Sequence, residues 1–213
     1  MPTDVPRLIY GFDPLCGWCY GLIPAMRRWR DLRPDVPVEL VCGGLVTGDR
    51  VGPYREMAGY VRAASTRMTQ VTGQALSDAF FALIEGPDSP ERSASAPPTR
   101  AILAVRERGD DALGYAHALQ EAHFRDGLDL NAPDTHRRVA RRLDTEPPPL
   151  EGLASTDERE PAVAAEFARA RALGLRSFPA VLAAGPDGTA RAVAVDYDPE
   201  TFVARADAAL ASG

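Results

Sequence analysis

The feature that most limits how this chain can fold is a pair of cysteines, Cys16 and Cys19, lying between an expected strand and an expected helix. Residues 7–12 form a short β-prone apolar run that ends at Asp13-Pro14. Apolar residues then recur at helical spacing over residues 16–32. The order strand, tight turn and helix places both sulfurs in the first turn of a helix.

The rest of the chain predicts an α/β fold interrupted by helices. A second strand is expected at residues 38–42, and its short return implies a parallel pair with a right-handed crossover. Strand signals then vanish, and helices are expected at residues 54–71, 76–84, 99–108, 113–124 and 133–143, with proline-rich loops at 86–98 and 146–149. The pattern is completed by a helix at 160–173, a hairpin of two strands at 178–183 and 190–195 with its turn at 185–188, and a helix at 199–210. We therefore expect a sheet domain at 1–50 and 154–213 and an inserted all-helical domain at 51–153.

Two cysteines at this spacing suit thiol–disulfide exchange. Free backbone N–H groups and the helix dipole favour an anion at the first turn, so Cys16 is the expected nucleophile. Cys19 lies on the same face but deeper, and it is the expected resolving thiol. Gly17 and Trp18 complete the turn, and the indole offers an apolar surface to a peptide-like partner.

Zinc is the alternative use of such a pair, but a zinc site needs four ligands. The remaining candidates, Cys42, His117, His123 and His136, do not form a second pair at short spacing. Cys42 is expected to be a buried, inert thiol, with a regulatory role as the alternative. The histidines are expected to pack in the helical block, and His123 is the one that could face the dithiol.

A proline at the opening of an expected strand is a second sign of a redox site. Phe178-Pro179 begins the run at 178–183, and a trans proline would be awkward there, so a cis bond is predicted. A cis bond would place the Phe178 backbone beside the sulfurs, where its N–H and C=O can pair with an extended substrate.

Composition and charge exclude several classes of function. The formal net charge is −6, so nucleic acid is not an expected partner. No apolar stretch is long enough for a membrane span. The first residues contain no pattern of a secretory signal, so a cytoplasmic location is expected, where cysteines serve redox or metal chemistry more often than structural disulfides.

Four segments resemble the DsbA-like family of thioredoxin-fold proteins, in its cytoplasmic branch of protein-disulfide isomerases. They are residues 13–21 around the dithiol, Gly43-Gly44-Leu45, residues 122–130 and residues 177–180. The resemblance implies a thioredoxin-like fold with an inserted helical domain, Cys16 as nucleophile, Cys19 as resolving thiol and Pro179 in cis. One departure is that residues 7–12 hold no acid, whereas thioredoxins keep a buried carboxylate there, so its role would pass to Asp13, Glu39 or water.

The leading hypothesis is an enzyme of the protein-disulfide reductase or isomerase type. Its substrate would be a disulfide-containing protein or peptide, with glutathione as a further candidate, and no cofactor or metal is called for. The first alternative is a glutathione-dependent enzyme related to kappa-class transferases and hydroxychromene-carboxylate isomerases. The second is a non-catalytic binding domain whose dithiol senses redox state.

Overall fold

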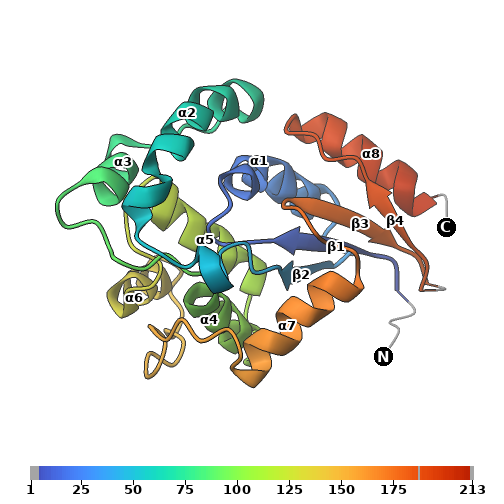
Figure 1. Ribbon diagram of the computed structural model, residues 1–213. Helices are drawn as coiled ribbons and strands as arrows, with labels where there is room; N and C mark the ends of the chain where they lie inside the picture. Colours follow the sequence, from blue (N-terminus) through green and yellow to red (C-terminus); the bar gives the residue numbers. More distant parts are fainter. Residues whose placement is uncertain (1–4, 187, 212–213) are drawn as a thin grey trace.

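The protein is built around a four-stranded sheet in the order β2-β1-β3-β4 (Figure 1). The computed structural model describes residues 5–186 and 188–211. Strand β1 (Arg7–Phe12) pairs in parallel with β2 (Val38–Cys42) and antiparallel with β3 (Ala180–Ala184), which pairs in turn with β4 (Ala190–Val193). The mixed α/β fold predicted from the sequence is confirmed.

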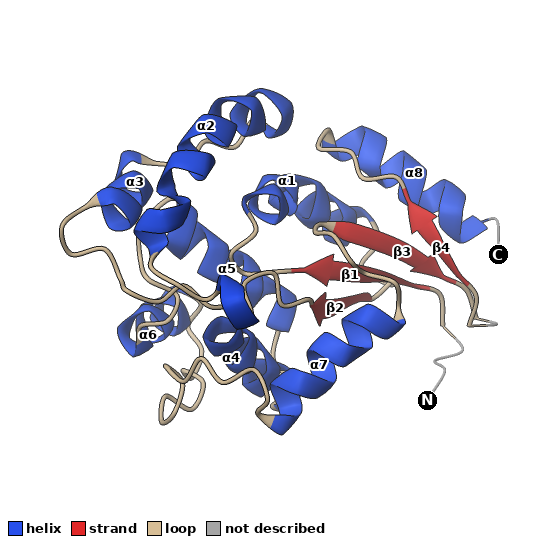
Figure 2. Ribbon diagram, viewed as in Figure 1, coloured by secondary structure: helices blue, strands red, loops and turns tan. Residues whose placement is uncertain are grey.

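Helices cover both faces of the sheet because alternate residues of β1 point to opposite sides. Leu8, Tyr10 and Phe12 enter the main hydrophobic core, whereas Ile9 joins a smaller cluster on the other face. Helices α1 (Gly17–Leu32) and α8 (Pro199–Ala211) pack against each other on the first face, and α7 (Pro161–Ala172) packs on the second (Figure 2). The central strand is therefore buried on both sides, with its carboxyl end directed at the start of α1.

The segment between β2 and α7 is helical, as expected, and it lies to one side of the sheet (Figure 1). Its members are the short 3₁₀ turn η1 (Gly48–Arg50) and helices α2 (Tyr54–Thr72), α3 (Asp78–Glu85), α4 (Ala96–Glu107), α5 (Ala112–Phe124) and α6 (Pro133–Arg142). The main core continues from the sheet into α4 and α5. The division into domains at 1–50, 51–153 and 154–213 stays a prediction.

Some expected boundaries were wrong, and the strand expected at residues 190–195 ends at Val193. Pro97 and Pro98 lie in the first turn of α4 and not in a loop, because the first N–H groups of a helix have no intrahelical partner and proline loses nothing there. Phe178 and Pro179 precede β3, which begins at Ala180. The expected hairpin turn includes Asp187, which lies outside the described residues.

None of the helices in the described part of the chain is both long and apolar enough to cross a membrane.

Candidate active site

The two thiols lie at the start of α1, where the sequence places them. Cys16 is the N-cap residue, with extended backbone angles, and its carbonyl accepts hydrogen bonds from the N–H groups of Cys19 and Tyr20. Cys16 is 5% exposed and Cys19 is fully buried, and both are free thiols. The pair is thus ordered in depth, with only Cys16 reaching the surface.

The buried position of Cys19 alters its proton equilibrium. Burial raises the pKa of the Cys19 thiol well above its ordinary value, and the neighbouring Cys16 thiol adds to the rise. Tyr10, on β1 beneath the dithiol, directs its hydroxyl toward the Cys19 carbonyl at 3.5 Å. Burial, and then the two cysteines, raise the pKa of Tyr10 as well. The Cys19 thiol is therefore protonated at neutral pH in this state of the protein.

The predicted cis proline is confirmed, and its neighbour contacts the exposed thiol. The Phe178-Pro179 bond is cis, and the Cys16 thiol donates to the Phe178 carbonyl at 3.3 Å. The Phe178 ring occupies the space above Gly43, where an added Cβ would lie 1.7 Å from the ring. A glycine at position 43 is thus required for Phe178 to sit here.

Asp13 anchors the turn between β1 and α1. Its carboxylate is fully buried and accepts from Leu15 N at 3.0 Å, Leu45 N at 2.7 Å and Ser95 Oγ at 3.0 Å. Burial raises its pKa, and the hydrogen bond from Leu45 opposes the rise. Glu39, the other acid considered, pairs with Arg7 and Arg169 instead. Asp13 is therefore the carboxylate that lies beside the dithiol.

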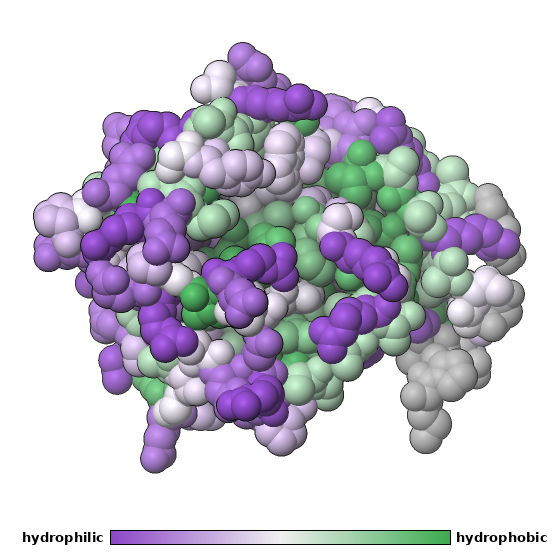
Figure 3. Space-filling model, viewed as in Figure 1, coloured by the Kyte–Doolittle hydropathy of each residue, from purple (hydrophilic) through white to green (hydrophobic). Residues whose placement is uncertain are grey.

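A largely apolar cleft of about 640 Å³ opens onto Cys16, Gly17 and Trp18. In Figure 3, hydrophobic residues gather in the middle of the face that lies between the helical segment and the sheet. The far wall comes from α2, where Met57 and Tyr60 are 49% and 70% exposed. Phe178 also lines the cleft, and Trp18 packs against Tyr197 with ring centroids 5.8 Å apart. Three of the predicted substrate-binding residues, Gly17, Trp18 and Phe178, thus meet in one cavity with Cys16.

Comparison with solved structures identifies the architecture. Cytosolic disulfide reductase DsbM from Pseudomonas aeruginosa superposes with a TM-score of 0.78 at 25% identity, covering 97% of this chain and 100% of DsbM. The structure of DsbM with GSH gives 0.73 at 25% identity, covering 95% and 98%. A structure from Streptomyces coelicolor that bears the name of a DsbA oxidoreductase gives 0.65 at 17% identity, covering 96% and 89%. The chain has the DsbA-like fold. No protein-family model and no curated protein sequence matches it.

The predicted resemblance to DsbA-like oxidoreductases is confirmed by these structures. Within the DsbA-like fold, Cys42 lies at the end of β2, fully buried, and burial raises the pKa of its thiol. Its backbone N–H donates to Glu166 at 3.0 Å, and Glu166 also pairs with Arg106. Cys42 thus belongs to the packing between β2 and α7.

The three histidines are buried in the helical part of the DsbA-like fold. His123 lines the cleft, as considered from the sequence, with its ring 5.0 Å from that of Phe80. Its Nδ1 lies 2.8 Å from the Leu128 carbonyl, and burial lowers its pKa to about 4. His136 bridges Tyr115 and the Leu130 carbonyl. The His123 ring is therefore a neutral part of the cleft wall at neutral pH.

Sequence reasoning missed four residues of the site. Tyr10 lies within an expected strand, and no sequence pattern marks it, Ser95, Gln120 or Tyr197 as part of the site. The Gln120 side-chain amide lies within hydrogen-bond distance of three carbonyls in the dithiol turn, Asp13 O, Pro14 O and Cys16 O. Gln120 is more than 100 residues from the motif, so no local pattern points to it.

Proposed function

We propose that this protein is a thiol–disulfide oxidoreductase of the reductase or isomerase type, with Cys16 as nucleophile and Cys19 as resolving thiol. The observation that supports it best is the arrangement at the start of α1. Cys16 faces an apolar cleft and the Phe178 carbonyl, and Cys19 lies fully buried on the inner side of Cys16. The 25% identity to a cytosolic disulfide reductase over nearly the whole chain supports the same reaction.

The reaction has two exchange steps. The Cys16 thiolate attacks one sulfur of a substrate disulfide, forms a mixed disulfide, and releases the other sulfur as a thiolate. Cys19 then loses its proton and attacks Cys16, which forms the intramolecular disulfide and releases the second substrate thiolate. The substrate disulfide gains two electrons and two protons, and the protein dithiol is oxidised. A thiol reductant returns the pair to its starting state.

The cleft favours a substrate with apolar groups next to its disulfide. Exposed apolar side chains on a cleft wall are typical of a binding surface. Phe178 precedes the cis proline and lies beside Cys16, where its backbone N–H and C=O can pair with an extended peptide. We therefore propose a disulfide-containing protein or peptide as substrate, and a cytoplasmic location by analogy with DsbM.

Glutathione is the small-molecule candidate, because DsbM has been solved with GSH. The rim of the cleft has groups suited to a zwitterionic peptide. Asp49 and Glu56 can accept from an ammonium, and the exposed Arg50 guanidinium, which has no ion pair or hydrogen bond to the described residues, can bind a carboxylate.

The test is reduction of insulin disulfides by the protein and three cysteine variants, with dithiothreitol as reductant. Cys16→Ser is expected to lose the activity completely, because no other exposed thiol can attack. Cys19→Ser is expected to retain the first step and accumulate a mixed disulfide on Cys16, detected by mass spectrometry. Cys42→Ala is the matched control, because Cys42 is equally buried but lies outside the cleft.

Equal insulin reduction by the parent protein and Cys16→Ser would contradict the proposal. The glutathione-dependent transferase or isomerase needs only one thiol, so it predicts that Cys19→Ser keeps full activity on an electrophilic substrate. A redox-sensing domain predicts no catalysed reduction by the parent protein.

A further inference from the structure

A buried amide from the helical segment reaches the dithiol turn. Gln120 lies on α5 and is fully buried. Its Nε2 is 3.0 Å from the carbonyl of Cys16, 3.2 Å from that of Asp13 and 3.4 Å from that of Pro14. A flipped amide would direct its oxygen at three carbonyl oxygens, so the geometry allows only the N–H groups to face the turn.

The three carbonyls belong to the segment that sets the position of Cys16. The Asp13 carbonyl accepts from Cys16 N at 3.0 Å, which closes the turn, and the Cys16 carbonyl begins the hydrogen bonds of α1. Gln120 thus ties the end of the turn to the start of the helix. Its two N–H groups donate to these backbone oxygens in buried contacts, and such donors are costly to remove.

The Cys16 carbonyl also shares a peptide unit with the N–H of Gly17, the first residue of α1. A donor on a carbonyl polarises the peptide and strengthens its N–H as a donor. This N–H is one of the groups at the helix start that have no intrahelical partner and can stabilise an anion. Gln120 therefore acts on both the position and the electrostatics of the Cys16 backbone.

We propose that Gln120 is a positioning residue through which α5 holds the dithiol turn in the geometry that Cys19 needs to attack the Cys16 sulfur. This inference rests on the proposed exchange reaction. A turn held less firmly affects the second step most, because that step needs two protein sulfurs aligned, whereas the first step needs only an accessible Cys16 thiolate.

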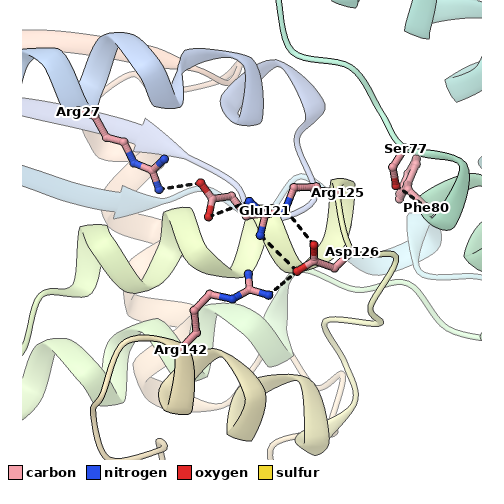
Figure 4. A network of polar contacts seen from close by, with 7 residues as sticks. All are labelled: Arg27, Ser77, Phe80, Glu121, Arg125, Asp126 and Arg142. Atoms are coloured by element: carbon pink, nitrogen blue, oxygen red, sulfur yellow. Dashed lines mark hydrogen bonds and ion pairs between the residues drawn. The ribbon is translucent and has the colours of Figure 1, made fainter.

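The neighbouring residue on α5 provides a comparison. Glu121 pairs with Arg27 of α1 at 2.7 Å and with Arg125 at 3.7 Å, in the network shown in Figure 4. The ion pair with Arg27 also joins α5 to α1, but both ion-pair partners of Glu121 lie outside the dithiol turn. Replacing Glu121 tests the docking of the two helices, and replacing Gln120 tests the hold on the turn.

A second comparison is Asn131, another buried amide. Asn131 is 8% exposed, its Nδ2 donates to the Arg92 carbonyl at 2.7 Å, and its Oδ1 has no partner among the described residues. The Oε1 of Gln120 is unpartnered in the same way. Asn131→Leu therefore measures what the loss of a buried amide does when no active-site carbonyl is involved.

The experiment follows the two steps separately with 5,5′-dithiobis(2-nitrobenzoate) and the reduced protein in a Cys42→Ala background. Each step releases one coloured nitrothiobenzoate thiolate from the reagent. The first release reports attack by Cys16, and the second reports resolution by Cys19. Gln120→Met, which keeps the shape but has no donor, is expected to slow the second release by about tenfold, the effect of one typical hydrogen bond, and the first release by less. Asn131→Leu and Glu121→Gln are expected to leave the ratio of the two rates within about twofold of the parent.

An unchanged second release in folded Gln120→Met would overturn the inference, as would an equal slowing in Asn131→Leu. If Gln120→Met does not fold, Gln120→Asn decides, because it keeps the amide but withdraws it by one methylene. An intermediate slowing is expected there, and none would overturn the inference. The proposed function is tested separately by insulin reduction, so a parent protein that shows both release phases but fails with insulin contradicts the proposed protein substrate and leaves the inference about Gln120 standing.

Discussion

At the scale of single residues, the site depends on a contact between Gly43 and Phe178. The Phe178 ring lies where a side chain at position 43 would be, and the Phe178 carbonyl accepts from the Cys16 thiol. The ring and the carbonyl belong to one residue, so a displacement of the ring that shifts the Phe178 backbone also moves the acceptor. Phe178 thereby couples Gly43 to Cys16.

Gly43→Ala is expected to lower the rate at which the protein reduces insulin disulfides by roughly tenfold or more. The added methyl group overlaps the Phe178 ring and forces this residue out of place. Replacing Phe178 with leucine in the same protein frees space, so the double variant is expected to regain thermal stability relative to Gly43→Ala. The two measurements are the steady-state rate and the melting temperature. A Gly43→Ala protein with parental activity would show that the ring can move without affecting the thiol.

At the scale of elements, α2 packs closely over the helix that holds the dithiol. Gly17 and Gly21 lie one turn apart on α1, and an added Cβ on them would lie 3.1 Å from the Met68 sulfur and 2.5 Å from Thr72 Cγ2. Small residues on one face of α1 therefore let α2 form the wall of the cleft. Helix α2 itself presents Met57 and Tyr60 to the cavity.

Gly21→Ala is expected to lower the free energy of unfolding by about 1–3 kcal/mol, because the methyl group overlaps Thr72 and α2 must move away. Gly59→Ala is the matched control, since Gly59 lies within α2 with nothing within 4 Å of the added Cβ. Alanine is favoured over glycine in a helix by about 1 kcal/mol, so this control is expected to be neutral or stabilising. Urea unfolding measures both, and equal effects in the two variants would contradict close packing at Gly21.

At the scale of the whole molecule, three buried histidines make stability depend on pH. Burial lowers the pKa of His117 to about 3 and those of His123 and His136 to about 4. An unfolded histidine titrates at about 6.5, so between these values the unfolded chain binds more protons than the folded one. The free energy of unfolding therefore falls as the pH drops below about 6.5. Asp13 has the opposite effect on the free energy of unfolding. Its pKa is raised in the folded protein, so the folded chain binds its proton more tightly than the unfolded chain does as the pH drops.

We expect each histidine to cost the folded state about 1–2 kcal/mol between pH 7 and pH 5, measured as the change in urea unfolding free energy. His117→Leu is expected to reduce this pH dependence by roughly a third, since it removes one of three titrating groups. The Nε2 of His117 has no partner among the described residues, so leucine leaves no polar group unpaired there. A pH dependence unchanged in His117→Leu would mean that this histidine is not the buried neutral group described.

Much of this molecule follows from local patterns in the sequence. The boundaries of β1 and β2, the start of α1 at the dithiol, the helical segment after β2 and the cis bond at Pro179 agree with expectation. Each rests on neighbouring residues, whose spacing and backbone preferences act over one or two turns. The reaction class is inferred from the same local signal, two cysteines at the first turn of a helix.

The tertiary structure alone decided what surrounds those cysteines. Phe178 is 162 residues from Cys16, and Ser95 is 82 residues from Asp13, yet both pairs are in hydrogen-bond contact. Such contacts depend on how helices and strands pack, and packing depends on the shapes of side chains across the whole core. A buried glutamine or tyrosine has no local pattern that distinguishes it from any other. The cysteine motif was therefore visible in the sequence, whereas the depth of Cys19, the cleft and the hold of Gln120 on the turn emerged only from the folded chain.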